Sequence, residues 1–261
     1  MKANNVLKGV LLVATSLMIV SCVSCVHRTR VFNKDSKQVS EVRNLKGFEE
    51  IEINGSPTVY YSQADSFSVI VTGPSESVNA IMTEVVNGAL TIKNRGKVGI
   101  FNVVLDGDDN AIVYVTSPDL VNVRLNGSGD FVGKNQVDTD EIGITLRGSG
   151  DISFDNIICD KCQIDLVGSG DVRMGRLDTK DLSATLIGSG DIELHEWNVQ
   201  TTDLHLKGSG DIDANLEQGC KNVSCELHGS GDITLTGSVD HYSIQKSGSG
   251  DIDVDDLEIR D

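Results

Sequence analysis

A four-residue motif, Gly-Ser-Gly-Asp, constrains the fold of this chain more than any other feature. It occurs seven times after residue 126, and successive aspartates are 21, 20, 20, 20, 21 and 19 residues apart. The copies end at Asp130, Asp151, Asp171, Asp191, Asp211, Asp232 and Asp251. A fixed period near 20 residues is typical of repeat proteins, in which each unit buries its apolar face against its neighbours.

Apolar residues flank every copy of the motif. One residue after the aspartate the chain has Phe131, Ile152, Val172, Ile192, Ile212, Ile233 and Ile252. Two residues before the first glycine it has Leu125, Leu146, Leu166, Leu186, Leu206, Leu227 and then Lys246. Apolar residues also alternate further along both flanks, and alternation is the pattern of a strand with one buried face. Each repeat therefore predicts a strand, a tight turn and a second strand.

These repeats predict an all-β fold, a β-solenoid with about 20 residues per coil. A looser middle segment of each coil adds apolar residues such as Ile157, Leu177 and Trp197. Lys246 departs from the leucine pattern, as a capping coil would. An antiparallel sandwich with a hairpin every ten residues is the alternative, but it does not explain why inward residue types share one period of 20.

Residues 41–126 form a strand-rich N-terminal part that lacks the motif, and residues 127–261 form the repeat solenoid. Within the N-terminal part, residues 54–56 (Asn-Gly-Ser) look like a degenerate first corner. Apolar residues spaced three and four apart predict a short helix within 75–86. Further strands are expected at 100–105 and 111–116, with an acidic loop between them.

The N-terminus has the pattern of a bacterial lipoprotein. Lys2 and Lys8 precede an apolar run of twelve residues, 9–20, which is short for a membrane span and fits a signal peptide. Residues 19–22 (Ile-Val-Ser-Cys) resemble a lipobox. We therefore expect a signal peptide over 1–21, a lipidated Cys22 and a polar tether through residue 40. The alternatives are an ordinary secretory signal and a single membrane anchor.

Charge restricts the partners. The formal net charge is −17, and a surface this acidic repels nucleic acid, whose binding depends on Lys and Arg contacts with phosphate. The sequence therefore excludes nucleic-acid partners. Acidity is compatible with a solvated surface and with divalent cations.

The repeated aspartates have a structural and a functional interpretation. Stacked coils would place Asp130, Asp151, Asp171, Asp191, Asp211, Asp232 and Asp251 in one column about 4.8 Å apart. Glycine fits a sharp stacked corner, and Ser and Asp can bond the backbone locally. Alternatively, the acidic column could bind Ca²⁺ or a partner, because calcium takes six to eight oxygen ligands. No cofactor is otherwise expected.

Cysteine and histidine give weak signals. Cys159 and Cys162 form a C-x-x-C pair, and Cys220 and Cys225 form a second pair that lies too far away for a shared zinc site or a disulfide between the pairs. We expect small buried residues or a local disulfide within each pair. His205 and His228 fall on outward strand positions. Residues 195–197 (His-Glu-Trp) could bind a sugar, although a buried or half-buried Trp197 is favoured.

The repeated corner, the Phe48-x-x-Ile-x-Ile segment and the turn at Gly55 resemble the DUF2807 family, also labelled "putative auto-transporter adhesin, head GIN domain", over about residues 40–261. The resemblance implies a right-handed parallel β-helix on a Bacteroidetes-type outer-membrane lipoprotein, facing the periplasm or the outside. It establishes no site residues. We expect a non-catalytic, adhesin-like module that binds a surface glycan or a protein. The alternatives are a polysaccharide lyase or hydrolase, since β-helices host such enzymes, and a purely structural stalk.

Overall fold

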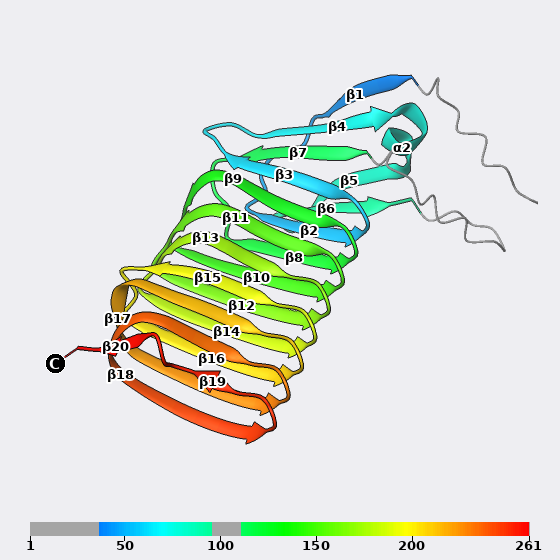
Figure 1. Cartoon of the computed structure of the whole chain (residues 1–261). Helices are drawn as coiled ribbons and strands as arrows, with labels where there is room; N and C mark the ends of the chain where they lie inside the picture. Colours follow the sequence, from blue (N-terminus) through cyan, green and yellow to red (C-terminus); the bar gives the residue numbers. More distant parts are fainter. Residues whose placement is uncertain (1–36, 96–110, 261) are drawn as a thin grey trace, which may run out of the picture. The chain divides into compact units, whose positions relative to one another are not determined.

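The computed structural model describes residues 37–95 and 111–260, which form a parallel β-solenoid of about seven turns with about 20 residues per turn (Figure 1). This confirms the expected fold class. The expected signal peptide, Cys22 and the strand at 100–105 lie outside the described residues.

One parallel ladder contains the strands that precede each corner, and we call it the first ladder. It runs through β2 (Glu50–Gly55), β8 (Asn122–Gly127), β10 (Glu141–Gly148), β12 (Lys161–Gly168), β14 (Asp181–Gly188), β16 (Thr201–Gly208) and the later parts of β17 (Ile212–Gly229) and β18 (Ile233–Gly248). Its register aligns the first glycine of each corner with that of the next coil, as in the pair Gly148 and Gly168.

The second ladder contains the strands that follow each corner. It runs through β3 (Thr58–Gln63), β9 (Asp130–Asp138), β11 (Asp151–Ile158), β13 (Val172–Asp178), β15 (Ile192–Trp197), the first parts of β17 and β18, β19 (Ile252–Asp253) and β20 (Leu257–Ile259). All of these pairs are parallel, so the antiparallel sandwich is excluded.

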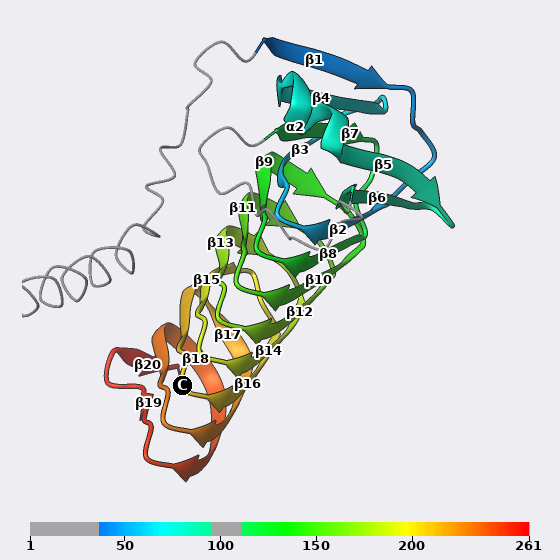
Figure 2. The same cartoon turned by 90° about the vertical axis from the view of Figure 1, so that its right-hand side faces the viewer.

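The N-terminal end of the solenoid is covered by a small mixed arrangement (Figure 2). It contains β1 (Gln38–Arg43), β4 (Ser68–Pro74), α2 (Ser75–Ala80), β5 (Ile81–Val86), β6 (Ala89–Asn94) and β7 (Ile112–Ser117). Within the described residues, antiparallel pairs occur only here, between β1 and β4, β4 and β7, and β5 and β6. β1 starts inside the range expected to be tether.

The helix expected within residues 75–86 is correct only for its first half. The chain leaves the helix at Ile81 and continues as β5, which pairs with β6. Ile81, Thr83 and Val85 are β-branched and alternate along the chain, a pattern that suits a pleated strand. The apolar spacing in this segment was compatible with both structures, and pairing with β6 decides for the strand.

The coils begin earlier than the first full motif. Gly55 aligns with Gly127, and the backbone N–H of Ser128 donates to the carbonyl oxygen of Gly55 at 3.0 Å. The degenerate corner at residues 54–56 is therefore confirmed as the corner beneath the first Gly-Ser-Gly-Asp copy. Both ladders consequently extend into the strand-rich N-terminal part.

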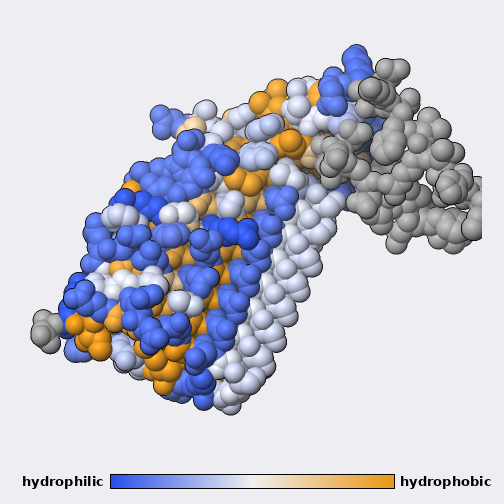
Figure 3. Space-filling view, in the orientation of Figure 1, coloured by the Kyte–Doolittle hydropathy of each residue, from blue (hydrophilic) through white to orange (hydrophobic). Residues whose placement is uncertain are grey.

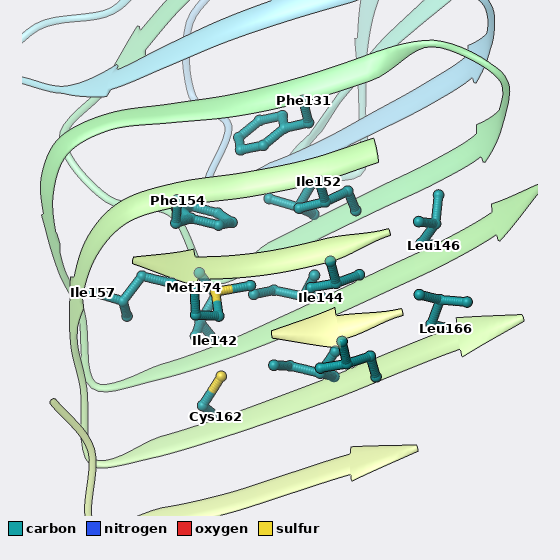
Figure 4. Close-up of a cluster of buried hydrophobic side chains, with 14 of the residues drawn as sticks. Phe131, Ile142, Ile144, Leu146, Ile152, Phe154, Ile157, Cys162, Leu166 and Met174 are labelled. Atoms are coloured by element: carbon teal, nitrogen blue, oxygen red, sulfur yellow. The ribbon is translucent and has the colours of Figure 1, made fainter. Parts of the chain in front are cut away.

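Inward side chains fill the solenoid in stacked columns (Figure 4). Leu146 and Leu166 stack on one side, and Ile152 follows Phe131 on the other; all four are fully buried. Aromatic rings continue the stacking, with centroids 5.2 Å apart for Phe131 and Phe154. Full burial of one such side chain contributes about 1.5–3 kcal/mol, so every coil depends on the column above and below it.

The corner requires glycine for two reasons. Gly168 has a φ of +147°, a region that disfavours residues with a Cβ, and a Cβ at this position would lie 2.0 Å from the carbonyl oxygen of Gly148 in the preceding coil. A Cβ on Gly170 would lie 1.8 Å from the carbonyl oxygen of Gly150. The stacked corners form the pale stripe along one edge of the molecule in Figure 3.

The last coil is open on its far side. Ile244 aligns with the buried Cys225 yet is 38% exposed, because no further strand among the described residues pairs with this part of β18. Lys246, which replaces the inward leucine, pairs with Asp251 at 2.7 Å. This agrees with the interpretation of a terminal capping coil. Across the described residues, no helix has the length and apolar character needed to cross a membrane.

Candidate binding surface

The repeated aspartates form a hydrogen-bonded column along the corner. From Asp171 onward, the backbone N–H of each aspartate donates to Oδ1 of the aspartate one coil earlier, at 2.6–3.1 Å. The acceptors are Asp151, Asp171, Asp191, Asp211 and Asp232. At the start of the column, Asp130 accepts from the hydroxyl of Thr58 through Oδ2, at 3.3 Å. The structure thus brings all seven predicted aspartates onto one edge.

This bonding explains how closely spaced carboxylates are tolerated. A hydrogen bond to a charged group contributes roughly 1.5–3 kcal/mol, which offsets repulsion of a few kcal/mol between neighbouring charges near a protein surface. Cations help locally: Arg173 donates to Oδ2 of Asp171 at 2.7 Å. The hydrogen bond from Lys246 holds the pKa of Asp251 below its ordinary value. The column therefore has a structural role as a side-chain ladder.

The geometry does not assemble a metal centre from these groups. In residues 37–95 and 111–260, no three His, Cys, Asp or Glu side chains are placed to hold an ion. Neighbouring aspartates are spread along the column, one per coil, and one oxygen of most of them already accepts a backbone N–H. Calcium binding by the column stays a hypothesis.

The outward face of the first ladder presents polar columns. One column contains Asn122, Gly143, Gln163, Ser183, Asp203 and Ser224, and the next contains Arg124, Thr145, Asp165, Thr185, His205 and Glu226. As expected, His205 and His228 point outward, and both are hydrogen-bonded to Glu226, at 3.1 and 2.8 Å. These contacts hold the pKa of Glu226 below its ordinary value.

The side chains of residues 195–197 do not share one face of the strand, because Glu196 is buried whereas His195 and Trp197 are partly exposed. Counting from the aspartates aligns Trp197 with the inward Leu177, but the structure aligns Leu177 with Glu196, because the two strands shift register after Met174. The count was wrong by one residue. Trp197 is half-buried, with the guanidinium of Arg176 4.1 Å from its ring centroid. Glu196 points into the core, so carboxylate and ring form no sugar platform.

Glu196 is the most unusual core residue. Its side chain is 1% exposed, Oε2 accepts from the Thr202 hydroxyl at 2.5 Å, and Oε1 has no partner among the described residues. Burial raises the pKa of Glu196 to about 7. The sequence signal for this buried acid was indirect: its partner Thr202 stands at an inward position that an apolar residue occupies in the other coils.

The four cysteines of the solenoid are free thiols inside the core. Cys162 and Cys225 occupy inward strand positions, as expected. Cys159 and Cys220 lie at the second turn of their coils, where the chain passes from the second ladder back to the first. Cys159 donates to the Thr179 hydroxyl at 3.4 Å. The hydrogen bond with Cys159, together with burial, holds the pKa of Cys162 well above its ordinary value. This favours the role of small buried residues.

The second turn of each coil has its own inward column, which sequence reasoning missed. It contains Thr139, Cys159, Thr179, Val199, Cys220 and Val239, all at most 8% exposed. Only small or β-branched side chains occur in it. The 20-residue spacing of these residues is a signal that could have found the column.

The fold defines a class of protein, a parallel β-solenoid that presents regular polar columns to solvent. The family model "Putative auto-transporter adhesin, head GIN domain" (DUF2807) matches residues 47–219 and 213–261. The chain belongs to this family. Its membership supports a binding role at the cell envelope or outside the cell.

Solved structures share the fold. A protein from Bacteroides fragilis, described as a putative adhesin, is 24% identical, with a TM-score of 0.71 over 83% of this chain and 96% of its own. A protein from Parabacteroides distasonis, described as a putative lipid binding protein, is 20% identical, with a TM-score of 0.63 over 87% and 98%. No curated protein matches the chain.

Proposed function

We propose that the chain is an exported, lipid-anchored envelope protein that binds a surface glycan or protein without catalysis. The observation that carries the proposal is the outward face of the first ladder. In-register strands place like polar positions one coil apart, and the glycine corners and the aspartate column fix that spacing. A rigid, repetitive face suits recognition of an extended or repeated ligand, because little ordering is needed on binding.

The anchoring part of the proposal is based on sequence. Residues 19–22 resemble a lipobox, and multiple acyl chains on Cys22 would give firm attachment, whereas one chain is marginal. The residues that follow Cys22 are Val-Ser-Cys-Val, without an acidic cluster. Both orientations, toward the periplasm and toward the outside, therefore belong to the proposal.

A binding role is favoured over an enzymatic one by the arrangement of acids. A glycoside-cleaving enzyme needs a single set of acid and base groups in a groove. In this chain the acids are the repeated feature, and the aspartates of the column bond to backbone. The alternative of a polysaccharide lyase or hydrolase rests on the β-helix fold alone. A structural stalk is the third candidate.

Two measurements test the proposal. Mass spectrometry of the membrane fraction is expected to find acyl groups on Cys22 and none in a Cys22→Ser variant. A glycan array with the full-length chain, together with a pull-down from envelope extracts, is expected to show saturable binding. Depolymerisation of any bound glycan would refute the non-catalytic role, and an unmodified, secreted mature chain would refute the anchor.

A further inference from the structure

The outward side of the described strands β1, β4, β7 and β3 carries no charged side chain. β3, β4 and β7 contain no charged residue at all. In β1, Glu41 and Arg43 align with the buried Val71 and Val69, so they lie on the opposite side of the sheet. Charged residues make up 23% of the chain and are mostly exposed in folded proteins, so this surface departs from the rest of the molecule. We call it the neutral face; its outward residues are Gln38, Ser40, Val42, Ser68, Ile70, Thr72, Ile112, Tyr114, Thr116, Thr58, Tyr60 and Ser62.

An apolar row crosses the neutral face from strand to strand and continues onto β9. Strand pairing places its members side by side, in the order Val42, Ile70, Tyr114, Tyr60 and Val132. Val42 is 64% exposed and Tyr114 is 46% exposed. The rings of Tyr60 and Tyr114 stack with their centroids 5.7 Å apart. Five strands spaced about 4.8 Å apart make the row on the order of 20 Å long, and Figure 3 shows orange and pale surface over β3, β4 and β7.

Hydroxyl groups border the apolar row on both sides, about 7 Å away along the strands. Thr116 donates to the carbonyl oxygen of Ser66 at 3.0 Å, and Thr58 donates to Oδ2 of Asp130 at 3.3 Å. A hydroxyl that donates can still accept, so these two offer acceptors that are held in place. The borders consist of Ser40, Thr72, Ile112 and Thr58 on one side and Ser68, Thr116 and Ser62 on the other.

The neutral face is confined to the N-terminal end of the solenoid. After Val132, the same outward row continues through Ser153, Arg173, Glu193 and Asp213. Arg173 and Glu193 form an ion pair at 3.8 Å. The repeated coils are therefore charged where the N-terminal strands are neutral, which makes the neutral face a single, localised surface.

The composition of the neutral face selects the chemical class of its ligand. Without Lys or Arg it has no group to attract phosphate or anionic lipid headgroups, and without Asp or Glu it has no carboxylate for a hard cation. It holds about a dozen residues, fewer than the roughly 20–30 per partner of a stable protein interface. A neutral oligosaccharide fits, because it combines apolar C–H surface with hydroxyl groups that both donate and accept.

We propose that the neutral face binds a neutral oligosaccharide that lies along the apolar row. Its C–H groups contact Tyr60 and Tyr114, which supply a large amphipathic surface at low entropic cost. Its hydroxyl groups donate to the hydroxyls of Thr58 and Thr116 at the two borders. The length of the row accommodates several consecutive sugar residues, so an oligomer binds more tightly than its monosaccharide. The inference rests on the proposed binding function and adds to it a localised surface with a stated ligand class.

The experiment is a calorimetric titration of the full-length chain with neutral oligosaccharides. The probes are cellotetraose, xylotetraose, mannotetraose, laminaritetraose and chitotetraose, each with its monosaccharide. We expect saturable heat with at least one tetrasaccharide and at least tenfold weaker binding of the corresponding monosaccharide. Absence of saturable heat with all five tetrasaccharides would overturn the proposal.

Two variants and one matched control locate the binding. Tyr114→Ala removes an exposed ring from the apolar row and should weaken binding at least tenfold. Thr116→Val keeps the shape of the border but removes its hydroxyl, and should weaken binding about fivefold. Tyr242→Ala removes a tyrosine that is 39% exposed on β18, in the last coil, and should leave the affinity unchanged. Melting curves verify folding, and equal affinities of Tyr114→Ala and wild type would overturn the site.

Light scattering and vesicle flotation test the other occupants of this surface. A dimer or a vesicle-bound state that Tyr114→Ala abolishes, in a chain that binds no sugar, would overturn the proposal in favour of a protein or lipid partner. If envelope material is captured equally by wild type and Tyr114→Ala, the neutral face is not the site and the envelope function stands. If sugars bind at Tyr114 but Cys22 carries no lipid and no envelope component is captured, the sugar site stands and the envelope function is wrong.

Discussion

Thr202 donates its hydroxyl hydrogen to Oε2 of Glu196 across 2.5 Å inside the solenoid. The other carboxyl oxygen of Glu196 has no partner in the described chain. The thiols of Cys162, Cys220 and Cys225 lie close enough to Glu196 for its charge to raise their pKa values. No cation is paired with Glu196 among the ion pairs of the described residues.

This arrangement predicts a stability that falls as pH rises toward neutrality. The folded state keeps the proton of Glu196 up to a pKa of about 7, whereas the ordinary value is 4.5. Between these values the folded state binds the proton and the unfolded state releases it, so the contribution of Glu196 to the free energy of unfolding decreases by about 3 kcal/mol. It is fully present below pH 4.5 and lost above pH 7.

Glu196→Gln should remove this pH dependence, because glutamine resembles the protonated acid. Urea denaturation, followed by the fluorescence of the single tryptophan, Trp197, should give similar stabilities for wild type and variant at pH 4. At pH 8 the variant should be more stable by about 3 kcal/mol. Glu193→Gln, on an exposed position of the same strand, is the control. Identical pH profiles for wild type and Glu196→Gln would contradict the buried-acid assignment.

Gly188→Ala should destabilise the fold strongly. Gly188 has a φ of +146°, and a Cβ there would lie 2.0 Å from the carbonyl oxygen of Gly168. Separating two coils at the corner is expected to cost about 3–5 kcal/mol. Thermal melts followed by circular dichroism measure the effect. Gly143→Ala, without positive φ or close backbone contact, should melt within a few degrees of wild type, and equal melting of both variants would refute the steric account.

Asp191→Ala should weaken the column by removing the acceptor of the Asp211 N–H. We expect a loss of about 1–3 kcal/mol in the free energy of unfolding, measured with urea. Asp191→Asn retains an acceptor oxygen and should recover most of this loss. The exposed Asp213 provides the control through Asp213→Ala. If Asp191→Ala and Asp213→Ala have the same small effect, the column does not stabilise the fold.

If the aspartate column has only a structural role, Ca²⁺ should not bind to the chain or change its stability. Calorimetric titration of the full-length chain with Ca²⁺ is expected to give no saturable heat, and the melting temperature should not move. A bound ion at one hundred times its Kd would add about 2.7 kcal/mol, which a melt would detect. A saturable heat that disappears in Asp191→Ala would establish the column as a cation site.

The sequence was sufficient for the repeated part of the fold because each coil obeys one steric rule. A glycine at the position of Gly168 and a leucine at the position of Leu166 recur in coil after coil. Their spacing therefore predicted both the corner and the inward column. The inward position of Glu196 was not predicted, because its strand has one residue fewer between Leu194 and the middle segment than the preceding strand has after Met174. The missing residue is regained near Asn198, which has a left-handed φ of +58°. A compensated slip of this kind leaves the aspartate spacing unchanged.

The N-terminal cap was beyond sequence reasoning for a different reason. The cap occurs once, so no period reveals that β4 lies antiparallel to β7.

The carbonyl oxygen of each corner glycine occupies the place that a side chain in the next coil would need. Coils of 19 to 21 residues are accommodated by shifts away from the corner, but an insertion or deletion within the corner would place a bulky residue here, whereas gain or loss of one whole coil would not. The stack of corners can therefore grow or shrink during evolution only by whole coils. The length of the solenoid is a counted quantity, set by the number of repeats in the gene.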